Sequence, residues 1–303
     1  MRDLAAASRL DVAAPYRLDL TVAVLRRFST NLVDIVAPDG TYLRAHLDEA
    51  ERPYVIDVRQ EAPETLVARL RVIDDGADVT RSRATALVRR VLGTDRQTAH
   101  FAREAATLPW LAGLVGRMTG VRAPRYATLW EACVNAIVFQ QVSLHAAGAI
   151  LGRTVRALGT PLELEGRSLY AFFSARTLAR AQDEALRTAG LSVAKIATLR
   201  RVAAALEAGD LDEAELAAMS SPEAAARLCA IKGIGPWTAA VILLRGLGRL
   251  DVFPQNDSGI ARSLQALTHE PVDIAGSLAR LAPEQGMLYY HLLLARLEAR
   301  GDL

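Results

Sequence analysis

The sequence predicts a mainly helical protein that is preceded by a small α+β domain with an antiparallel sheet. Two observations lead to this fold class. In about the first eighty of the 303 residues, apolar and polar side chains alternate in short runs separated by turn residues, which is typical of strands. From about residue 81 to the end, apolar residues instead recur at helical spacing. A chain of this length is expected to form two or three compact units.

The N-terminal part contains four runs with strand character. Residues 16–24, YRLDLTVAV, alternate apolar and polar side chains, which predicts a half-buried strand. Pro38-Asp39-Gly40 predicts a turn, and residues 41–47 alternate again after it. Residues 54–58 and 66–73 are further strand-like runs. Together these runs predict a small antiparallel sheet accompanied by about one helix.

The rest of the chain is predicted to be all-helical to its end. Pro222 and Pro236 stand where a first helical turn tolerates proline, and Gly246 stands where a helix ends. The predicted amphipathic helices cover residues 84–92, 97–106, 127–140, 143–157, 176–188, 193–207, 213–218, 222–230, 236–245, 258–268 and 286–299.

The net charge of +2 is distributed unevenly along the chain. Residues 1–80 sum to −4, whereas residues 81–125 carry nine Arg against Asp95 and Glu104 and sum to +7. Such a local basic stretch suits a polyanion such as nucleic acid better than an evenly charged surface does. The composition leaves open whether these arginines contact such a partner or only cover one part of the fold.

The two cysteines, Cys133 and Cys229, lie in apolar helical contexts, and we expect both to pack in the core. Two cysteines cannot hold an iron–sulfur cluster, and no Cys/His spacing suggests zinc, so no metal site is predicted. The N-terminus lacks the apolar segment of a signal peptide, and no stretch resembles a membrane span. These observations favour a soluble cytoplasmic protein.

The segment KGIGPWTA, residues 232–239, carries a Gly-x-Gly pattern that invites two phosphate-binding interpretations. A dinucleotide fingerprint needs a preceding strand and a third glycine, and a P-loop needs Gly-Lys-Ser/Thr, so both are excluded. The residues support a tight turn over 231–235 between the helices 222–230 and 236–245. This is either a plain helical hairpin or a turn whose backbone amides bind an anion.

The wider sequence around this hairpin resembles the helix-hairpin-helix/Gly-Pro-Asp superfamily of DNA glycosylases. The matching pattern is Leu228-x-x-Ile231-Lys-Gly-Ile-Gly-Pro-Trp-Thr-Ala, followed by a loop with Gly and Pro and then Asp257. Residues 136–143, AIVFQQVS, resemble a second element of that family. Within the superfamily the chain is most similar to the alkylated-base branch of 3-methyladenine DNA glycosylase II. The resemblance covers about residues 85–300, and the sheet domain matches only in kind.

This resemblance implies a two-lobed helical glycosylase core that contains the helix-hairpin-helix. On that basis we expect an N-terminal antiparallel-sheet domain over residues 1–80. One helical lobe is expected to combine residues 81–130 with 250–303, and a second lobe over 131–249 is expected to contain the hairpin.

The resemblance also implies a monofunctional DNA glycosylase that hydrolyses the N-glycosidic bond of alkylated purines, of the 3-methyladenine and 7-methylguanine type, in base excision repair. The implied partner is double-stranded DNA with a damaged base, bound by a monomer near the nucleoid, and no membrane is involved. No cofactor is implied, although a monovalent cation bridging the hairpin carbonyls and a DNA phosphate stays open. Two alternatives remain: a glycosylase for oxidised or deaminated bases on the same fold, and a non-catalytic helix-hairpin-helix protein that binds DNA damage.

By the same resemblance, the hairpin residues are expected to hold a DNA phosphate: Lys232, Gly233, Ile234, Gly235 and Thr238. A glycosylase must flip its target base out of the duplex, so a wedge has to fill the vacated stack. Gln141, together with the adjacent Gln140, is the expected wedge, since Gln141 occupies the family's intercalating position in the turn between two helices.

Asp257 is the residue that the resemblance assigns to catalysis. A carboxylate near the sugar stabilises the positive charge that develops as the base departs, or orients the attacking water. From position alone, Asp257 is equally well explained as the N-cap of the helix that begins at Ser258.

Trp237 occupies the place where the bifunctional branch carries a lysine that attacks the sugar. An indole cannot act as that nucleophile, which predicts base excision without strand cleavage. The only lysines are Lys195 and Lys232. Lys232 lies on the hairpin, and the family does not place the helix of Lys195 in the pocket.

Aromatic rings in the pocket would favour a cationic alkylated base. The candidates are Trp237, Phe139, Phe253 and Tyr289, each of which is also explained by core packing. Val241 stands where the branch often has another pocket aromatic, so the pocket is expected to be less aromatic than in the branch.

Overall fold

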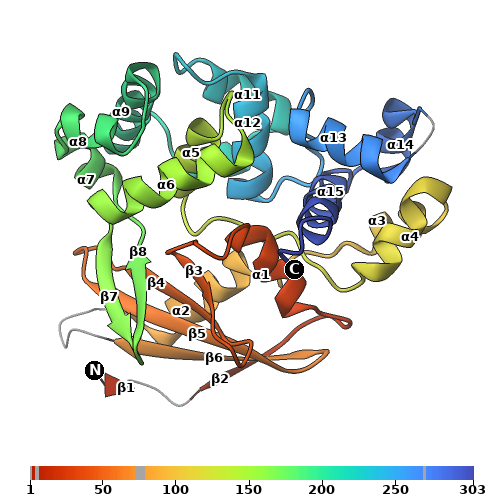
Figure 1. Ribbon diagram of the computed structural model, residues 1–303, viewed down its shortest axis with the longest axis horizontal. Coiled ribbons are helices and arrows are strands. Elements are labelled where there is room, and N and C mark those ends of the chain that lie inside the picture. The colour runs from red at the N-terminus through yellow and green to blue at the C-terminus, as the bar shows by residue number, and fades with distance from the viewer. Residues whose placement is uncertain (1, 4–6, 73–78, 269–270) are drawn as a thin grey trace.

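The computed structural model describes residues 2–3, 7–72, 79–268 and 271–303. At the bottom of Figure 1 lies an antiparallel sheet, above which stand the helices. Its strands follow the order β1-β6-β5-β4-β3, and β2 also pairs with β6. The strands are β1 (Arg2–Asp3), β2 (Ser8–Asp11), β3 (Asp34–Val36), β4 (Tyr42–Leu47), β5 (Pro53–Ala62) and β6 (Thr65–Val72). The predicted class, mainly helical with a small N-terminal antiparallel sheet, is confirmed.

Three of the four predicted strands are confirmed, namely those at 41–47, 54–58 and 66–73, the last of which ends in residue 73, outside the described residues. The turn before β4 is also confirmed. Asp39 accepts the backbone N–H of Thr41 at 3.0 Å, and Gly40 has φ +83°.

The strand predicted over residues 16–24 is wrong, because this segment forms helix α1 (Leu18–Arg26). One side of α1 packs on the sheet through Leu18 and Val22. The other side packs on the C-terminal helices through Leu20 and Val24. Because α1 is buried on two sides, its apolar residues do not form the single apolar stripe that is typical of a surface helix. The exposed Asp19 between Leu18 and Leu20 therefore gave the segment the alternating pattern of a strand.

The predicted helices are confirmed except that residues 176–188 form two short helices instead of one, and α4 and α14 were not predicted. Helix α12 continues as a π-helical turn, η1 (Leu243–Leu247). The helices after α1 are α2 (Arg81–Val91), α3 (Ala99–Ala106), α4 (Pro109–Arg117), α5 (Leu129–Val138), α6 (Leu144–Leu158), α7 (Ala175–Arg180), α8 (Asp183–Thr188), α9 (Val193–Ala208), α10 (Glu213–Ala218), α11 (Ser221–Cys229), α12 (Pro236–Ile242), α13 (Ser258–Leu267), α14 (Ile274–Leu281) and α15 (Gly286–Glu298).

The expectation of an all-helical remainder is also wrong, because β7 (Thr160–Leu164) and β8 (Arg167–Ala171) form a hairpin. Its turn residues, Glu165 and Gly166, both have positive φ, as a two-residue hairpin turn requires. Apolar side chains of the hairpin pack with Leu43 and Val55 of the N-terminal sheet. The hairpin stands beside the sheet at the left of Figure 1.

The apolar side chains gather in separate cores. One unites α5, α9, α11 and α12, and a second unites α1, α3, α4, α13 and α15. A third lies between the sheet, α1 and α2. Cys133 is buried in the first core and Cys229 packs against it, as expected. The division of the chain at residues 80, 130 and 249 stays a prediction.

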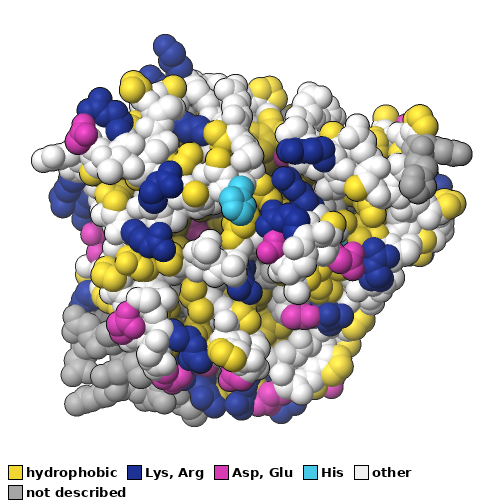
Figure 2. All heavy atoms as spheres, viewed as in Figure 1, with side chains coloured by type: hydrophobic (Ala, Val, Ile, Leu, Met, Phe, Trp, Pro, Cys, Tyr) yellow, Lys and Arg dark blue, Asp and Glu magenta, His cyan; other side chains and the backbone are white. Residues whose placement is uncertain are grey.

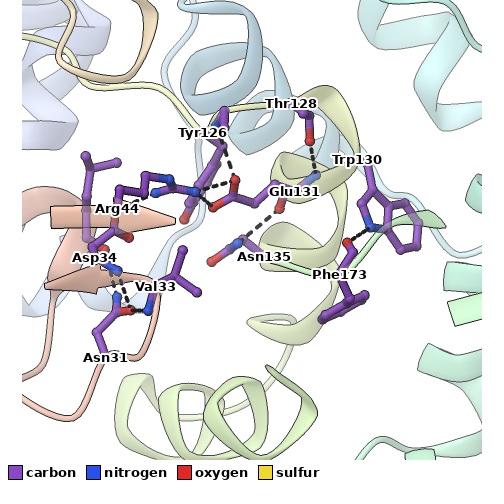
Figure 3. Close-up of polar contacts among 12 residues, drawn as sticks. Asn31, Val33, Asp34, Arg44, Tyr126, Thr128, Trp130, Glu131, Asn135 and Phe173 are labelled. Atoms are coloured by element: carbon purple, nitrogen blue, oxygen red, sulfur yellow. Dashed lines mark hydrogen bonds and ion pairs between the residues drawn. The ribbon is translucent and has the colours of Figure 1, made fainter. Parts of the chain in front are cut away.

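A buried ionic cluster ties the sheet to α5 (Figure 3). Arg44 of β4 bonds Asp34 of β3 and, at 2.5 Å, the carboxylate of Glu131 in α5. Tyr42 donates a hydrogen bond to Asp34 at 2.7 Å. Because each charge is paired inside the protein, the cluster fixes the position of α5 over the sheet.

Within the described part of the chain, none of the helices is both long and apolar enough to cross a membrane.

Candidate functional site

A cavity of about 910 Å³ opens where six segments far apart in the sequence converge. The residues that line it come from the C-terminal end of α1, the α5–α6 turn, the first turns of α9, the α11–α12 hairpin, the start of α13 and one side of α15. Such a volume is ample for a single nucleobase with part of its sugar.

Asp257 lies in the wall of this cavity and is held from two sides. Its Oδ1 accepts the backbone N–H groups of Gly259 at 2.7 Å and Ile260 at 3.0 Å, so it caps α13. Its Oδ2 accepts the indole N–H of Trp237 at 3.0 Å. The cap and the cavity position are therefore both present, and the indole fixes the direction in which the carboxylate faces.

The predicted helical hairpin is present as α11, a tight turn and α12. Gly233 has φ +104°, and a Cβ there would lie 2.0 Å from the Thr198 hydroxyl of α9, so the fold itself requires this glycine. Gly235 differs, since no atom lies within 4 Å of a Cβ placed on it. As the N-cap of α12, Gly235 also supplies no side chain to the first N–H groups of that helix. The outer side of the turn is thus open to an anion.

The other predicted hairpin residues face different ways. Lys232 is exposed, whereas the side chain of Ile234 is buried in the core. Thr238 is buried, and its hydroxyl accepts a hydrogen bond from Gln140 at 2.8 Å.

The two glutamines of the α5–α6 turn also differ. Gln140 bonds both Thr238 and, at 2.9 Å, the carbonyl of Gly233, so it joins the end of α5 to the hairpin. Gln141 is exposed at the cavity with φ +53°, and exposed Val142 follows it. The structure therefore presents Gln141 outward and holds Gln140 in place.

Three of the four predicted pocket aromatics, Trp237, Phe139 and Tyr289, line the cavity. Phe253 does not line it and instead packs against the core of the C-terminal helices. Burial raises the pKa of Tyr289 to about 12, so its hydroxyl stays protonated at neutral pH.

The expectation that the helix of Lys195 avoids the pocket is wrong. Lys195 lines the cavity, and its ammonium group donates to the carbonyl of Val138 at 2.8 Å. Burial lowers the pKa of Lys195. Sequence reasoning located α9 correctly but had no means of placing its first turn beside α5.

Three arginines in the cavity wall were also missed: Arg27, Arg262 and Arg296. Arg262 lies in α13, the helix that Asp257 caps, and Arg296 lies in α15. Arg27 directly follows α1. Because residues 16–24 were predicted to form a strand, the end of this helix was not recognised, and no sequence pattern indicated that Arg27 would reach the cavity. Figure 2 shows that Lys and Arg side chains are spread over the helical half of the face in view.

The basic stretch at 81–125 does not line the cavity. Most of its arginines form ion pairs with carboxylates, among them Arg90 with Glu213, and Arg125 with Asp95 at 2.5 Å. Three of the paired carboxylates, Glu49, Glu213 and Glu298, come from other segments of the fold and offset part of the formal charge of +7.

Among the described residues, no three His, Cys, Asp or Glu side chains are grouped so as to hold a metal ion.

Comparison with known proteins identifies relatives of this chain. A family model described as HhH-GPD superfamily base excision DNA repair protein matches residues 134–272. DNA-3-methyladenine glycosylase 1 of Schizosaccharomyces pombe is 31% identical over 167 residues, covering 53% of this chain and 67% of that protein. A Mycobacterium tuberculosis protein named probable bifunctional transcriptional activator/DNA repair enzyme AlkA is 34% identical over 65% of this chain. The match spans only 39% of the length of that protein.

The fold is that of a solved 3-methyladenine DNA-glycosylase from Archaeoglobus fulgidus. The two structures superimpose with a TM-score of 0.78 over 96% of this chain and 99% of the other, at 24% sequence identity.

Proposed function

The chain belongs to the HhH-GPD superfamily of base excision DNA repair proteins, and we propose that it is a monofunctional DNA glycosylase that removes alkylated purines from duplex DNA. One observation carries this proposal: Asp257, oriented by Trp237, lies in the wall of a cavity beside a hairpin whose outer side is open. The names of the S. pombe and M. tuberculosis relatives support the substrate class and the repair role.

In this proposal the hairpin holds the DNA backbone. A phosphate approaches Gly235 and accepts hydrogen bonds from the first N–H groups of α12, with Lys232 supplying a nearby positive charge. Such contacts carry no sequence information, which suits an enzyme that must search all DNA.

The target nucleotide leaves the duplex and enters the cavity, and Gln141 fills the space that it vacates. Trp237, Phe139 and Tyr289 surround the base, and their faces suit a flat ring and a positive charge.

Asp257 then stabilises the positive charge that develops on the sugar as the bond to the base breaks, and water completes the hydrolysis. The N–H groups of Gly259, Ile260 and Trp237 all donate to this carboxylate and hold it in place in the cavity wall. Trp237 cannot form a Schiff base, so the sugar–phosphate backbone is left intact.

The proposal includes no cofactor, and a monovalent cation between the hairpin carbonyls and the phosphate is the one ion that the family resemblance leaves open. It places the protein as a monomer on DNA in the cytoplasm.

The decisive experiment compares wild type with Asp257→Asn on methylated duplex DNA, measuring free bases and abasic sites. We expect the rate of release to fall by about 10²–10³-fold, the range seen when a group that stabilises transition-state charge is removed. Asparagine caps helices about as well as aspartate, so the free energy of unfolding should change by no more than about 1 kcal/mol.

Asp257→Ala is the matched control, since it removes the cap together with the charge. Release that survives in Asp257→Asn would overturn the catalytic role of Asp257, whereas no release by wild type would leave a DNA-damage-binding protein without catalysis as the better description. Parallel duplexes with 8-oxoguanine or hypoxanthine test the alternative base classes.

A further inference from the structure

Asn135 is a buried polar residue in the cavity wall that the proposed reaction does not use. It lies in α5, is 6% exposed, and lines the cavity one helical turn before Phe139, whose backbone N–H bonds the Asn135 carbonyl at 3.1 Å. Its Nδ2 donates to the backbone carbonyl of Glu131 at 3.0 Å. In Figure 3 the amide oxygen lies at the outer end of this side chain, away from α5.

The bond to Glu131 fixes the direction of the Asn135 amide. A backbone carbonyl can only accept, so the group that faces it is the NH₂, and the oxygen is left over. Among the described residues, no donor reaches this oxygen. It is not fully enclosed by protein atoms, although Asn135 is buried as a whole. A buried acceptor costs free energy until a ligand or water donates to it, so the cavity contains an acceptor that awaits an N–H group.

Asn135 lies deeper in the cavity wall than the two groups assigned to the sugar and the base. Asp257 and Trp237 are only half-buried. A nucleotide whose sugar lies at Asp257 would direct into the cavity the edge of the base that is farthest from the sugar. The ring of Phe139 lies beside that path, and the Asn135 oxygen is the acceptor one helical turn away from it.

Resting on the glycosylase function proposed above, we infer that Asn135 accepts a hydrogen bond from the amine at position 6 of the flipped base. It thereby makes the cavity favour alkylated adenines over alkylated guanines, which the cavity still admits. Asn135 is a specificity-determining residue in this proposal and takes no part in breaking the bond to the sugar.

The chemistry behind this preference is the matching of a donor to an acceptor. 3-Methyladenine, the base in the name of the S. pombe relative, carries all of its N–H groups on the amine at position 6. In DNA its ring is cationic, and a share of that charge on the amine strengthens the bond to an oxygen acceptor. Guanine has a keto oxygen at position 6, and two acceptors that face each other form no bond. A site with a buried acceptor therefore discriminates against the base that lacks the donor.

The first test uses one methylated duplex that contains both 3-methyladenine and 7-methylguanine. Their single-turnover release rates are measured for wild type, Asn135→Leu and Asn135→Asp. Because the two bases differ in intrinsic lability, the informative quantity is the change in their ratio between proteins. We expect Asn135→Leu, which is similar in size but has no acceptor, to lower the ratio of 3-methyladenine to 7-methylguanine release by about tenfold.

Asn135→Asp is the matched control for that ratio. A carboxyl group at position 135 presents an oxygen acceptor whether it is ionised or protonated, so the ratio should stay close to that of wild type. A purely structural role of Asn135 would lower the release of both bases together and would leave their ratio unchanged.

A second test needs no cleavage. Isothermal titration calorimetry measures the binding of free 3-methyladenine and free 3-methylhypoxanthine, which differ in carrying an amine or a keto oxygen at position 6. Wild type should bind 3-methyladenine about tenfold more tightly, and Asn135→Leu should lose that preference.

The outcomes separate the two proposals. Failure of wild type to release any base, with the preference for free 3-methyladenine intact, would overturn the glycosylase activity and leave the role of Asn135. Equal binding of both free bases by wild type would overturn the role of Asn135. A release ratio that Asn135→Leu leaves unchanged would do the same. Thermal unfolding of each variant identifies a loss caused by misfolding, and Asn135→Ala, which also removes the acceptor and suits a helix, then replaces Asn135→Leu.

Discussion

At the scale of single residues, Asp257 and Trp237 show how a carboxylate in the cavity wall is held from two sides. One oxygen of Asp257 caps α13, and the other accepts the indole N–H. Position in the sequence predicted either a cap or a catalytic residue; the structure shows the cap on a carboxylate that also lies in the cavity wall, and the catalytic role stays a prediction. Capping and catalysis by Asp257 are therefore compatible. The Asp257→Asn variant keeps a side chain that can cap α13 but removes the charge, so it tests the catalytic role by itself.

The prediction that belongs to this scale concerns Lys195. Because its ammonium donates to the Val138 carbonyl and Trp237 fills the lyase position, we expect no covalent protein–DNA adduct when borohydride is added during turnover. The opposing effect is burial, which lowers the pKa of Lys195 and makes a neutral amine more accessible. The measurement is the fraction of protein trapped on abasic or methylated duplex.

Lys195→Ala is the control for that measurement. Trapping in wild type that disappears in Lys195→Ala would identify Lys195 as a lyase nucleophile and end the monofunctional assignment. Trapping that persists in the variant would point instead to Lys232 or the N-terminal amine.

At the scale of elements, the two glycines of the hairpin have separable roles. Gly233→Ala should destabilise the protein by about 2–4 kcal/mol, because the new Cβ meets Thr198 in a backbone conformation that alanine rarely adopts. Gly235→Ala should change the free energy of unfolding by no more than about 1 kcal/mol, since the space there is open. A methyl group at 235 would instead hold a phosphate away from the helix N-terminus.

We therefore expect Gly235→Ala to weaken binding to undamaged duplex by about tenfold, the cost of losing hydrogen bonds to a charged group. Chemical denaturation and fluorescence anisotropy measure the two effects. Unchanged DNA affinity in Gly235→Ala would remove the hairpin from the proposed interface.

The elements also show which patterns could be predicted. The hairpin and the helices around it were predictable because each has boundary residues and one apolar side. The α1 helix was not predictable, because it is buried between two cores and its apolar residues therefore do not recur along one side at helical spacing. The β7–β8 hairpin did carry a signal, Glu165-Gly166 between alternating leucines, which the surrounding helical patterns obscured.

At the scale of the whole molecule, the site depends on contacts between segments that no local pattern reveals. Arg27 reaches the cavity because α1 packs between the sheet and α15, and α5 is fixed over the sheet by Arg44 and Glu131. Family resemblance predicted Asp257, the hairpin and the α5–α6 turn. It could not place Arg27 or Lys195, because their positions follow from how whole elements dock.

The last prediction concerns α15, which packs against α1, α4 and α13 in the second core. His291 in α15 is 3% exposed and lies 4.7 Å from the ring of Phe101, measured between ring centres. Burial lowers the pKa of His291 to about 4 from 6.5. As pH falls below 6.5, the unfolded chain takes up a proton that the folded protein refuses until about pH 4, so stability must decrease across that window.

The full shift corresponds to roughly 3 kcal/mol lost between pH 6.5 and 4. Urea unfolding at pH 7, 6, 5 and 4.5 should show this decrease, and His291→Leu should flatten it. Some decrease should remain in that variant, because burial also depresses the pKa of His46. His145→Gln, at an exposed position, is the matched control and should follow wild type. If the free energy of unfolding fell equally with pH in wild type and in His291→Leu, burial in α15 would not be what keeps this histidine neutral.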